Sequence, residues 1–340
     1  MNFELDDDQR LLADSAERFL TQQGQYEWQH IIDAGWLSLP FAEADGGLGG
    51  RLQDSMVLFQ QLDKGLMVEP LWDNAYLAGA IVKRIQHPQR EQWLSELMLG
   101  QAQFAVAIHE YEHAFSLTHH QTKAEARADG YCLNGSKCCV LNGEAAQHIF
   151  VLAQLSGQPA LFVVKQDQPS VTILGHRLVD GARAAEVRFQ NVLIDEVSLL
   201  SQGNAAVEIM RQALHESGLA RMAEACGIID LLVKDTLSFV KTRQQFGVSI
   251  GSFQALQHRL VDMFMMSEQC RSLLLAATLK AEQLDADAEQ TFKHLQSMVK
   301  EYGQKIAQEA IQMHGGMGMT HEVNVGRYLK RLLAIGSTNV

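Results

Sequence analysis

Two switches in hydrophobic periodicity, near residues 103 and 201, constrain the fold of this chain more than any other feature. Up to the first switch, apolar residues such as Leu11, Leu12 and Phe19 recur at steps of three and four, which indicates amphipathic helices. Short β-prone runs follow, and the helical period then returns until about Gln312. The pattern predicts an α+β chain with a helical domain, a β domain and a C-terminal helical bundle. Their predicted ranges are 1–103, 104–200 and 201–340.

The middle region carries runs that favour strands, at a spacing that suits a compact barrel or sandwich. The dipeptides Asp129-Gly130, Asn134-Gly135 and Asn142-Gly143 fit tight hairpin turns between them, because glycine adopts positive φ without a steric penalty. The runs are Phe104–Ile108, Lys123–Ala128, Tyr131–Leu133, Lys137–Leu141, Ile149–Leu155, Ala160–Val164, Val171–Ile173 and Ala185–Phe189.

The C-terminal region predicts three long helices with apolar stripes, at residues 205–243, 253–284 and 288–313. The links between them are short, which indicates antiparallel packing in a bundle. The N-terminal region is helical as well, with turns at Gly35 and at residues 45–50.

The charge balance disfavours two classes of function. Lys and Arg total 28 against 40 Asp and Glu, and the net charge of −12 repels nucleic-acid phosphates and anionic lipid surfaces alike. The segment Met1–Asp8 is acidic where a signal peptide is basic, and no apolar run approaches the length of a membrane span. We expect a cytoplasmic protein.

Cysteine and histidine usage favours reduced thiols over disulfides or metal ligands. Five cysteines are an odd number in a chain without an export signal, and the adjacent Cys138 and Cys139 have no second cluster at zinc spacing. Four histidines lie close together in the sequence, but no metal-binding spacing joins them, so we predict no metal site. They are His109, His113, His119 and His120.

A glycine-rich segment at the end of the last long predicted helix is the sharpest local signal. Residues 312–322 read Gln-Met-His-Gly-Gly-Met-Gly-Met-Thr-His-Glu. Gly315, Gly316 and Gly318 remove side chains where a ligand can approach the backbone, and exposed amides can face an anion. Taken alone, a tight turn at a helix C-terminus is the simpler interpretation.

A second segment, residues 243–254, strengthens the case for a ligand. Arg243 supplies a permanent cation, Phe246 an aromatic face, and Gln245 and Gln254 supply amides around a glycine-containing turn. This combination suits a dinucleotide, with Arg243 facing a pyrophosphate and Phe246 near a heterocycle. An ordinary interhelical loop with a surface arginine is the alternative.

Together the two segments resemble the acyl-CoA dehydrogenase family. The family's pattern is an Arg, then Gln-Phe-Gly, then Phe-Gln, and later Gln-x-x-Gly-Gly-x-Gly before an acidic residue; this chain meets it in order from Arg243 to Glu322. Similar signatures occur upstream, so the resemblance covers essentially the whole chain. They are Gly35-Trp36, Gly46-Gly47-Leu48-Gly49, Glu69-Pro70, Leu133-Asn134-Gly135 with Lys137, and Phe189-Gln190-Asn191-Val192.

The resemblance implies an all-α N-terminal domain, a middle β-barrel or sandwich, and a C-terminal four-helix bundle, with FAD held between the subunits of an oligomer. It implies α,β-desaturation of an acyl-CoA thioester in fatty acid or lipid metabolism. A carboxylate removes the α proton, the flavin accepts the β hydride, and electrons leave through an electron-transfer flavoprotein. The implied cofactor contacts are Arg243, Gln245, Phe246, Gln254, Gln312, Gly315 and Gly316.

The catalytic base departs from the family pattern. Many members carry a Glu well beyond the Gly-Gly motif, but no Asp or Glu follows Glu322 here. Other members place the base on the first long bundle helix, at the position of Ser217, which has Glu216 beside it. An offset of one residue turns a helical side chain by about 100°, so Glu216 needs a local shift to serve. We take Glu216 as the candidate base and Glu224 as a further one, with solvated helix carboxylates as the alternative for both.

The β domain and the tail depart from the pattern as well. The first predicted strand leads into residues 108–113, where the family usually has a Thr-Glu-Pro motif at the flavin. Cys139 and Leu141 stand where an aromatic residue and a Thr usually cover the flavin ring. Arg331 occupies a usually acidic position, and the chain ends at Val340, before the family's last helix.

This asymmetry resembles the smaller subunits of heteromeric acyl-CoA dehydrogenases. We predict that the chain supplies half of a shared FAD site to a longer, base-bearing subunit in a heterotetramer, with a homo-oligomer as the alternative. Two other interpretations stay open: a catalytically silent partner that clamps FAD, and a related flavin oxidase or monooxygenase.

Overall fold

The computed structural model describes residues 5–22, 27–66, 69–112 and 116–337. They form two compact units, which we treat separately. Unit 1 comprises Met1–Gln25, Arg51–Met67 and Gly218–Asn339, and unit 2 comprises Tyr26–Gly50 and Val68–Ser217. Helix α6 (Asn204–Thr242) begins in unit 2 and ends in unit 1.

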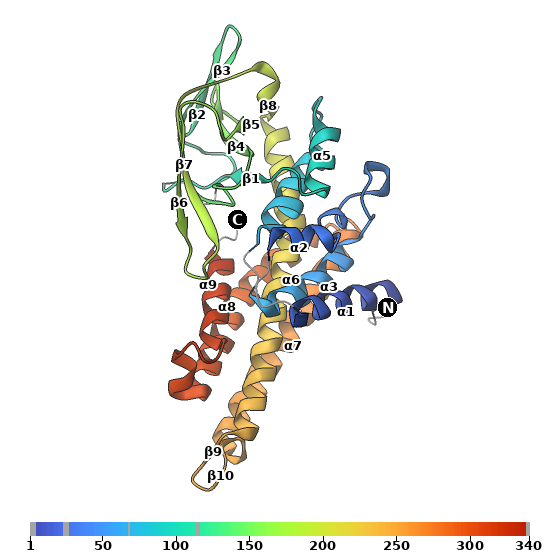
Figure 1. Cartoon of the computed structure of the whole chain (residues 1–340), viewed down its shortest axis with the longest axis vertical. Coiled ribbons are helices and arrows are strands. Elements are labelled where there is room, and N and C mark those ends of the chain that lie inside the picture. The colour runs from blue at the N-terminus through green and yellow to red at the C-terminus, as the bar shows by residue number, and fades with distance from the viewer. Residues whose placement is uncertain (1–4, 23–26, 67–68, 113–115, 338–340) are drawn as a thin grey trace. The chain divides into compact units, whose positions relative to one another are not determined.

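Unit 1 is helical. The helices predicted at residues 205–243, 253–284 and 288–313 are confirmed to within two residues at each end, as α6, α7 and α8. Helices α7 and α8 lie side by side (Figure 1). The helices that unit 1 adds to α6 are α1 (Asp7–Gln22), α3 (Leu52–Leu62), α7 (Gln254–Glu282), α8 (Ala288–His314) and α9 (Val325–Ser337).

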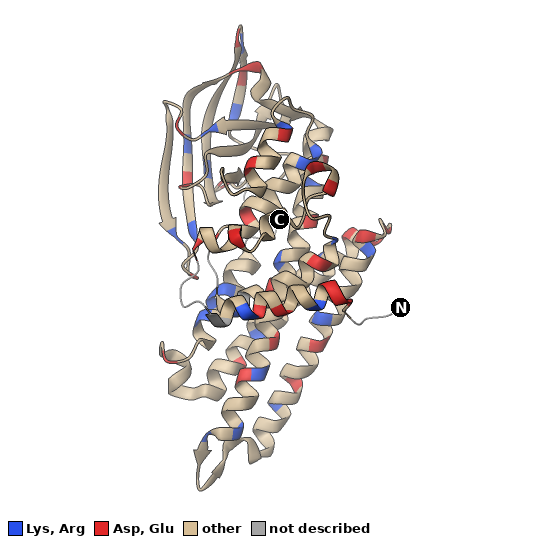
Figure 2. Ribbon diagram, turned by 45° about the vertical axis from the view of Figure 1, so that its right-hand side comes forward, with Lys and Arg blue, Asp and Glu red and all other residues tan. Residues whose placement is uncertain are grey.

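Helical spacing of apolar residues explains the packing of unit 1. On α8, Leu295, Val299 and Ile306 are buried at steps that keep them on one face. On α7, Met263 and Cys270 are buried one heptad apart. Acidic and basic residues are interspersed along the exposed faces of the helices (Figure 2). Within the described ranges, no helix has both the length and the apolar character that a membrane crossing requires.

Unit 2 is built around an eight-stranded sheet in the order β6-β7-β3-β2-β4-β5-β8, with β1 beside β4. Strands β1 and β2 each pair with β4 in parallel, and the other pairs are antiparallel. The strands are β1 (Phe104–Ala107), β2 (Lys123–Arg127), β3 (Gly130–Leu141), β4 (His148–Leu155), β5 (Gln158–Lys165), β6 (Val171–Arg177), β7 (Arg183–Ile194) and β8 (Leu199–Gln202).

Two of the three predicted hairpins are wrong. A hairpin with Ala128 and Asp129 in its loop joins β2 to β3 close to the predicted position, but β3 continues through Asn134-Gly135, with a shift of its register against β7. Gly135 is required there for another reason: its φ is +145°, and a Cβ would lie 2.5 Å from Cα of Thr122. Asn142-Gly143 is a turn, but the strands it connects, β3 and β4, are not neighbours in the sheet. The short strand β8 was not predicted.

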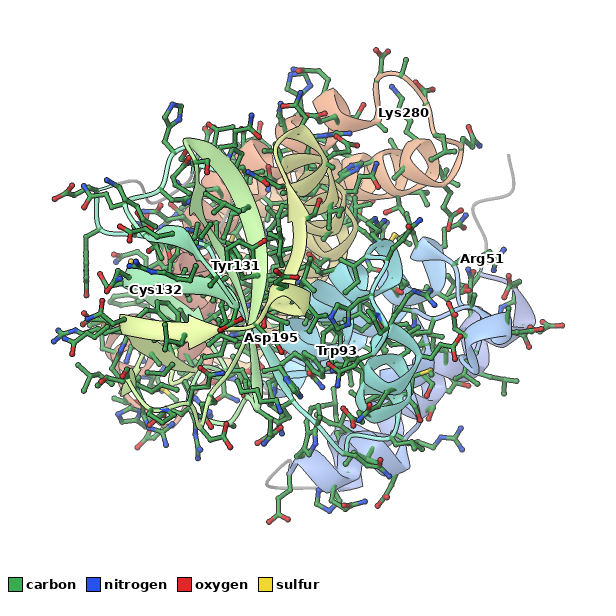
Figure 3. The ribbon with its side chains drawn as sticks, turned by 90° about the horizontal axis from the view of Figure 1, so that it is seen from above. Arg51, Trp93, Tyr131, Cys132, Asp195 and Lys280 are labelled. Atoms are coloured by element: carbon green, nitrogen blue, oxygen red, sulfur yellow. The ribbon has the colours of Figure 1, made fainter. Side chains whose placement is uncertain are left out.

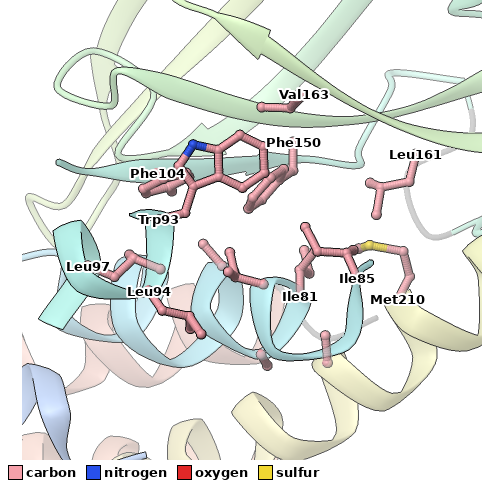
Figure 4. Packing of buried hydrophobic residues seen from close by; sticks show 14 of the residues in the cluster. Ile81, Ile85, Trp93, Leu94, Leu97, Phe104, Phe150, Leu161, Val163 and Met210 are labelled. Atoms are coloured by element: carbon pink, nitrogen blue, oxygen red, sulfur yellow. The ribbon is translucent and has the colours of Figure 1, made fainter. Parts of the chain in front are cut away.

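Helices cover one face of the sheet within unit 2. Trp93 packs edge-on against Phe104 and Phe150, with ring centroids 6.1 and 6.2 Å apart (Figure 4). On the opposite face, Tyr131 packs against Phe162 at 5.3 Å, and Figure 3 shows Trp93 and Tyr131 on the two sides of the sheet. The helices of unit 2 are α2 (Trp28–Asp33), the π-helical turn η4 (Trp72–Ala78), α4 (Gly79–Arg84), α5 (Arg90–Met98) and the first part of α6.

Candidate functional site

A strained hairpin follows α6 in unit 1. Strands β9 (Gln244–Gln245) and β10 (Val248–Ser249) are joined by Phe246 and Gly247, whose φ angles are +54° and +79°. Positive φ at both central residues is the geometry of a type I′ turn, which a bulky residue adopts only at a cost. The Phe246 side chain is nevertheless 92% exposed. An exposed aromatic ring held in a strained turn is typical of a binding element.

The polar residues predicted beside this hairpin are also exposed. Arg243 follows the last turn of α6, where its N–H donates to Phe239 O at 2.8 Å and its C=O accepts from Ile250 N at 2.9 Å. Within the part of the chain that the structure describes, no hydrogen bond or ion pair holds the Arg243 guanidinium. Gln245 and Gln254 are exposed on β9 and at the first residue of α7.

The second predicted segment ends α8. Gln312 is exposed on its last turn, and Gly315 begins the short 3₁₀-helix η7 (Gly315–Met319) with φ of +60°. A Cβ added at Gly315 or at Gly316 would meet nothing within 4 Å, so the backbone there borders open space. Gly318 differs, because a Cβ there would lie 2.7 Å from Ile311 O. Gly318 therefore serves the turn, while the other two leave room for a ligand.

An aromatic contact brings the two segments to the same end of unit 1. The ring of His314 stacks on Phe239 with centroids 4.2 Å apart, and its Nδ1 lies 2.8 Å from Ala310 O. Phe239 precedes Arg243 by one helical turn, and His314 directly precedes Gly315. The last turns of α6 and α8, which lead into the two predicted segments, are thus in contact within unit 1.

The candidate base Glu216 is held by two cations within unit 2. Its Oε1 bonds to Lys83 Nζ, and its Oε2 accepts from Arg84 Nη2 at 2.6 Å. Burial favours the neutral acid, but the two cations outweigh it and hold the pKa of Glu216 below its ordinary value. Ser217, at the position where some family members carry the base, is buried with its hydroxyl donating to Ala213 O at 2.7 Å.

Glu224, the further candidate, is clamped in the same way in unit 1. Its side chain is fully buried, Arg221 Nη1 donates to Oε2 at 2.9 Å, and Arg331 Nε donates to Oε1. The cation at position 331 thus belongs to an ion-pair network inside the bundle. Arg331 stands at a position that is usually acidic in the family, and its sequence context alone does not reveal Glu224 as its partner.

A buried ion pair in unit 2 was missed by the sequence reading. Lys137 Nζ, fully buried on β3, donates to Glu110 Oε1 at 2.8 Å and to Ile108 O at 3.0 Å. Glu110 also accepts the N–H groups of Gln121 at 2.6 Å and Thr122 at 3.0 Å. Burial lowers the pKa of Lys137 to about 8, and the pKa of Glu110 lies at about 2 because Lys137 outweighs its burial. The sequence contains one signal of this ion pair, a single Lys in an otherwise apolar β-prone segment.

A polar pocket of about 580 Å³ lies elsewhere in unit 2. Trp93 and Asp195, both labelled in Figure 3, line it together with His148 and Lys165. His87 stacks on Trp93 at 4.4 Å at its rim. None of the predicted site residues lines this pocket.

Across the described ranges, no three His, Cys, Asp or Glu side chains are grouped as metal ligands, and His113 lies outside those ranges.

Comparisons with known proteins point to one protein family. Residues 105–192 match the family described as acyl-CoA dehydrogenase, middle domain, and residues 207–336 match acyl-CoA dehydrogenase, C-terminal domain. The chain is 27% identical to the probable acyl-CoA dehydrogenase YngJ of Bacillus subtilis, over 99% of this chain and 96% of that protein.

Two solved structures share the fold. One is a glutaryl-CoA dehydrogenase from Mycobacterium smegmatis in complex with FADH2, with a TM-score of 0.87, 20% identity, and coverage of 97% of this chain and 90% of that one. The other is the ChsE4–ChsE5 complex from Mycobacterium tuberculosis, with a TM-score of 0.86, 23% identity, and coverage of 99% and 95%.

Proposed function

Because the chain belongs to the acyl-CoA dehydrogenase family, we propose that it is an FAD-dependent subunit that desaturates an acyl-CoA thioester at its α,β bond in a complex with a longer, base-bearing subunit. An electron-transfer flavoprotein is the proposed electron acceptor. The supporting observation is a difference in availability between the residues predicted to hold the cofactor and those that could act as the base. The residues predicted to contact the dinucleotide are exposed and follow two helix ends that touch each other, whereas both candidate bases form ion pairs.

The residues at the end of unit 1 fit the adenosine and pyrophosphate portion of FAD. Arg243 offers an exposed cation for a phosphate, and Phe246 offers a ring face for a heterocycle. Gly315 and Gly316 leave open space beside the backbone. When bound, FAD supplies the hydride acceptor, and the protein contributes its orientation.

The flavin-ring half has less support in this chain. A general base needs an acceptor atom that can approach the substrate proton and is available to bind it. Glu216 is already bonded to Lys83 and Arg84, and Glu224 to Arg221 and Arg331. We therefore assign the base to the partner subunit and give Glu216 an anchoring role between α4 and α6.

Purification of this chain alone and together with a longer, base-bearing acyl-CoA dehydrogenase subunit from the same source tests the proposal. We expect the complex to carry FAD and its flavin absorbance to bleach with a member of a panel of acyl-CoA thioesters. The chain alone should bind FAD weakly and should not bleach. Rapid bleaching of the lone, fully flavinylated chain would refute the shared site, and peroxide formation without an electron acceptor would instead support an oxidase.

Arg243→Ala in that complex is expected to weaken FAD binding by about 10- to 100-fold, the loss of one charge-assisted contact to phosphate. FAD retained after gel filtration and its dissociation constant measure the effect. Lys293→Ala is the matched control, because Lys293 is an exposed cation on α8 that pairs with Glu289. Equal flavin contents in the two variants would contradict the assignment of Arg243.

A further inference from the structure

Two adjacent cysteines occupy a β-bulge in β3, and neither is among the proposed cofactor contacts or candidate bases. The register of β3 against β7 shifts between Lys137 and Val140. Cys138 and Cys139 therefore lie opposite a single residue of β7, Glu186. The extra residue leaves the ladder locally irregular and changes the directions in which the side chains point.

This irregularity lets neighbouring thiols share one side of the strand. In a regular strand, successive side chains point to opposite faces. Cys139 breaks that alternation with a φ of +50°, a left-handed conformation that is unusual for a residue with a side chain. The bulge thus places two cysteines side by side in the strand, opposite one residue of β7.

The two thiols differ in exposure. All five cysteines lie within the described ranges; Cys139 is exposed, and the other four are buried. Burial, and then the neighbouring Cys139, raises the pKa of Cys138 to about 11. Burial likewise raises the pKa of Cys270 to about 12. Cys139 is therefore the thiol that meets a solute first, and its neighbour in the strand is a second, buried thiol.

We propose that Cys138 and Cys139 form a redox-active vicinal dithiol, which a small disulfide such as oxidised glutathione converts reversibly to a protein disulfide. The Cys139 thiolate attacks one sulfur of the small disulfide, forms a mixed disulfide and releases one small thiol. The Cys138 thiolate then attacks Sγ of Cys139, forms the protein S–S bond and releases the second small thiol. The protein loses two electrons and two protons, which the two released thiols carry.

Geometry makes the product easy to reduce. Consecutive Cα atoms are about 3.8 Å apart across a trans peptide, below the roughly 4.4–6.8 Å that disulfides usually span. The closed ring is therefore strained, and strained, accessible disulfides have the more oxidising potentials found in labile and regulatory bonds. Because the bulge and the positive φ of Cys139 already interrupt the regular strand here, the backbone can adjust to the closed ring more easily than in a flat strand.

Mass spectrometry of the full chain tests the proposal. The native protein is incubated with oxidised glutathione, quenched with acid, alkylated and digested. We expect the peptide containing both residues to become two hydrogens lighter, to escape alkylation, and to recover both thiols in dithiothreitol. Cys138→Ser should stop at the glutathione adduct on Cys139, and Cys139→Ser should slow thiol loss by at least about tenfold, since only buried thiols remain.

Cys132→Ser is the matched control, because Cys132 is buried on the same strand, and it should leave the result unchanged. Thermal melting confirms that each variant is folded, and Cys138→Ala replaces Cys138→Ser if the hydroxyl is not tolerated. A wild-type protein that stops at the glutathione adduct, or that links either residue to a different cysteine, would overturn the proposal. So would the same rate of thiol loss in Cys139→Ser as in the wild type.

Discussion

Lys137→Met is expected to lower the free energy of unfolding by about 3–5 kcal/mol, because it leaves the Glu110 carboxylate buried without its cation. The side chains are 0% and 5% exposed, so water cannot replace the lost contact. Met fills nearly the same volume, so the change removes charge rather than packing. Urea or guanidinium titration at neutral pH measures the effect, which is a large fraction of a typical domain's stability.

The double variant Lys137→Met/Glu110→Gln separates charge from shape. It removes both charges and keeps an acceptor oxygen for the N–H groups of Gln121 and Thr122, so it should be more stable than Lys137→Met alone. Arg127→Met serves as the surface control, because its pair with Glu125 is exposed and should contribute less than about 1 kcal/mol. A loss below about 1 kcal/mol in Lys137→Met would contradict the argument.

The pH dependence of the free energy of unfolding provides a second test of this prediction. The pKa of Glu110 is about 2 in the folded protein against 4.5 ordinarily, so its contribution to stability is complete above pH 4.5 and is lost as the pH falls toward 2. In Lys137→Met, the unpaired buried carboxylate has a raised pKa instead, and protonation relieves its penalty. The stability gap between variant and wild type should therefore narrow between pH 7 and pH 4.

Local sequence patterns predicted the helices and most strands because those elements bury apolar residues at a fixed period. The three long helices needed only residues such as Leu295, Val299 and Ile306 on one face. Asn134-Gly135 was misread because its glycine is required by a long-range contact, the close approach of Thr122, which no local pattern records. The short strand β8 pairs only with β5 and carries little periodicity of its own.

For the candidate site too, the sequence gives the local motifs but not the long-range contacts between them. Arg243 and Gly315 were recognisable as motif residues, but the contact between the helix ends that carry them, Phe239 stacked on His314, joins positions far apart in the sequence. Carboxylates are harder to judge, because the sequence gives their positions and not their partners. Glu216 and Glu224 looked like available bases, yet each lies between two cations that the fold brings to it.

Glu224→Gln is expected to destabilise the protein by about 3–5 kcal/mol, because it removes the buried carboxylate that both Arg221 and Arg331 bind. The side chain of Glu224 is 0% exposed and those of both arginines are 9% exposed, so solvent screens the repulsion poorly. Thermal and denaturant unfolding measure the loss. Glu322→Gln is the control, since Glu322 is exposed beside η7 and should change stability little.

The same variant separates a structural carboxylate from a catalytic one. If Glu224 or Glu216 removed the α proton, its replacement by Gln in the assembled complex would lower kcat by about 10²–10⁴-fold. We expect instead that the complexes that remain folded keep their kcat to within a few-fold, and that stability falls in both variants. Arg331→Met should destabilise without lowering kcat, because it leaves Glu224 with Arg221 alone. A large fall in kcat at constant flavin content in either Glu variant would show that the catalytic base belongs to this chain and would contradict its assignment to a partner subunit.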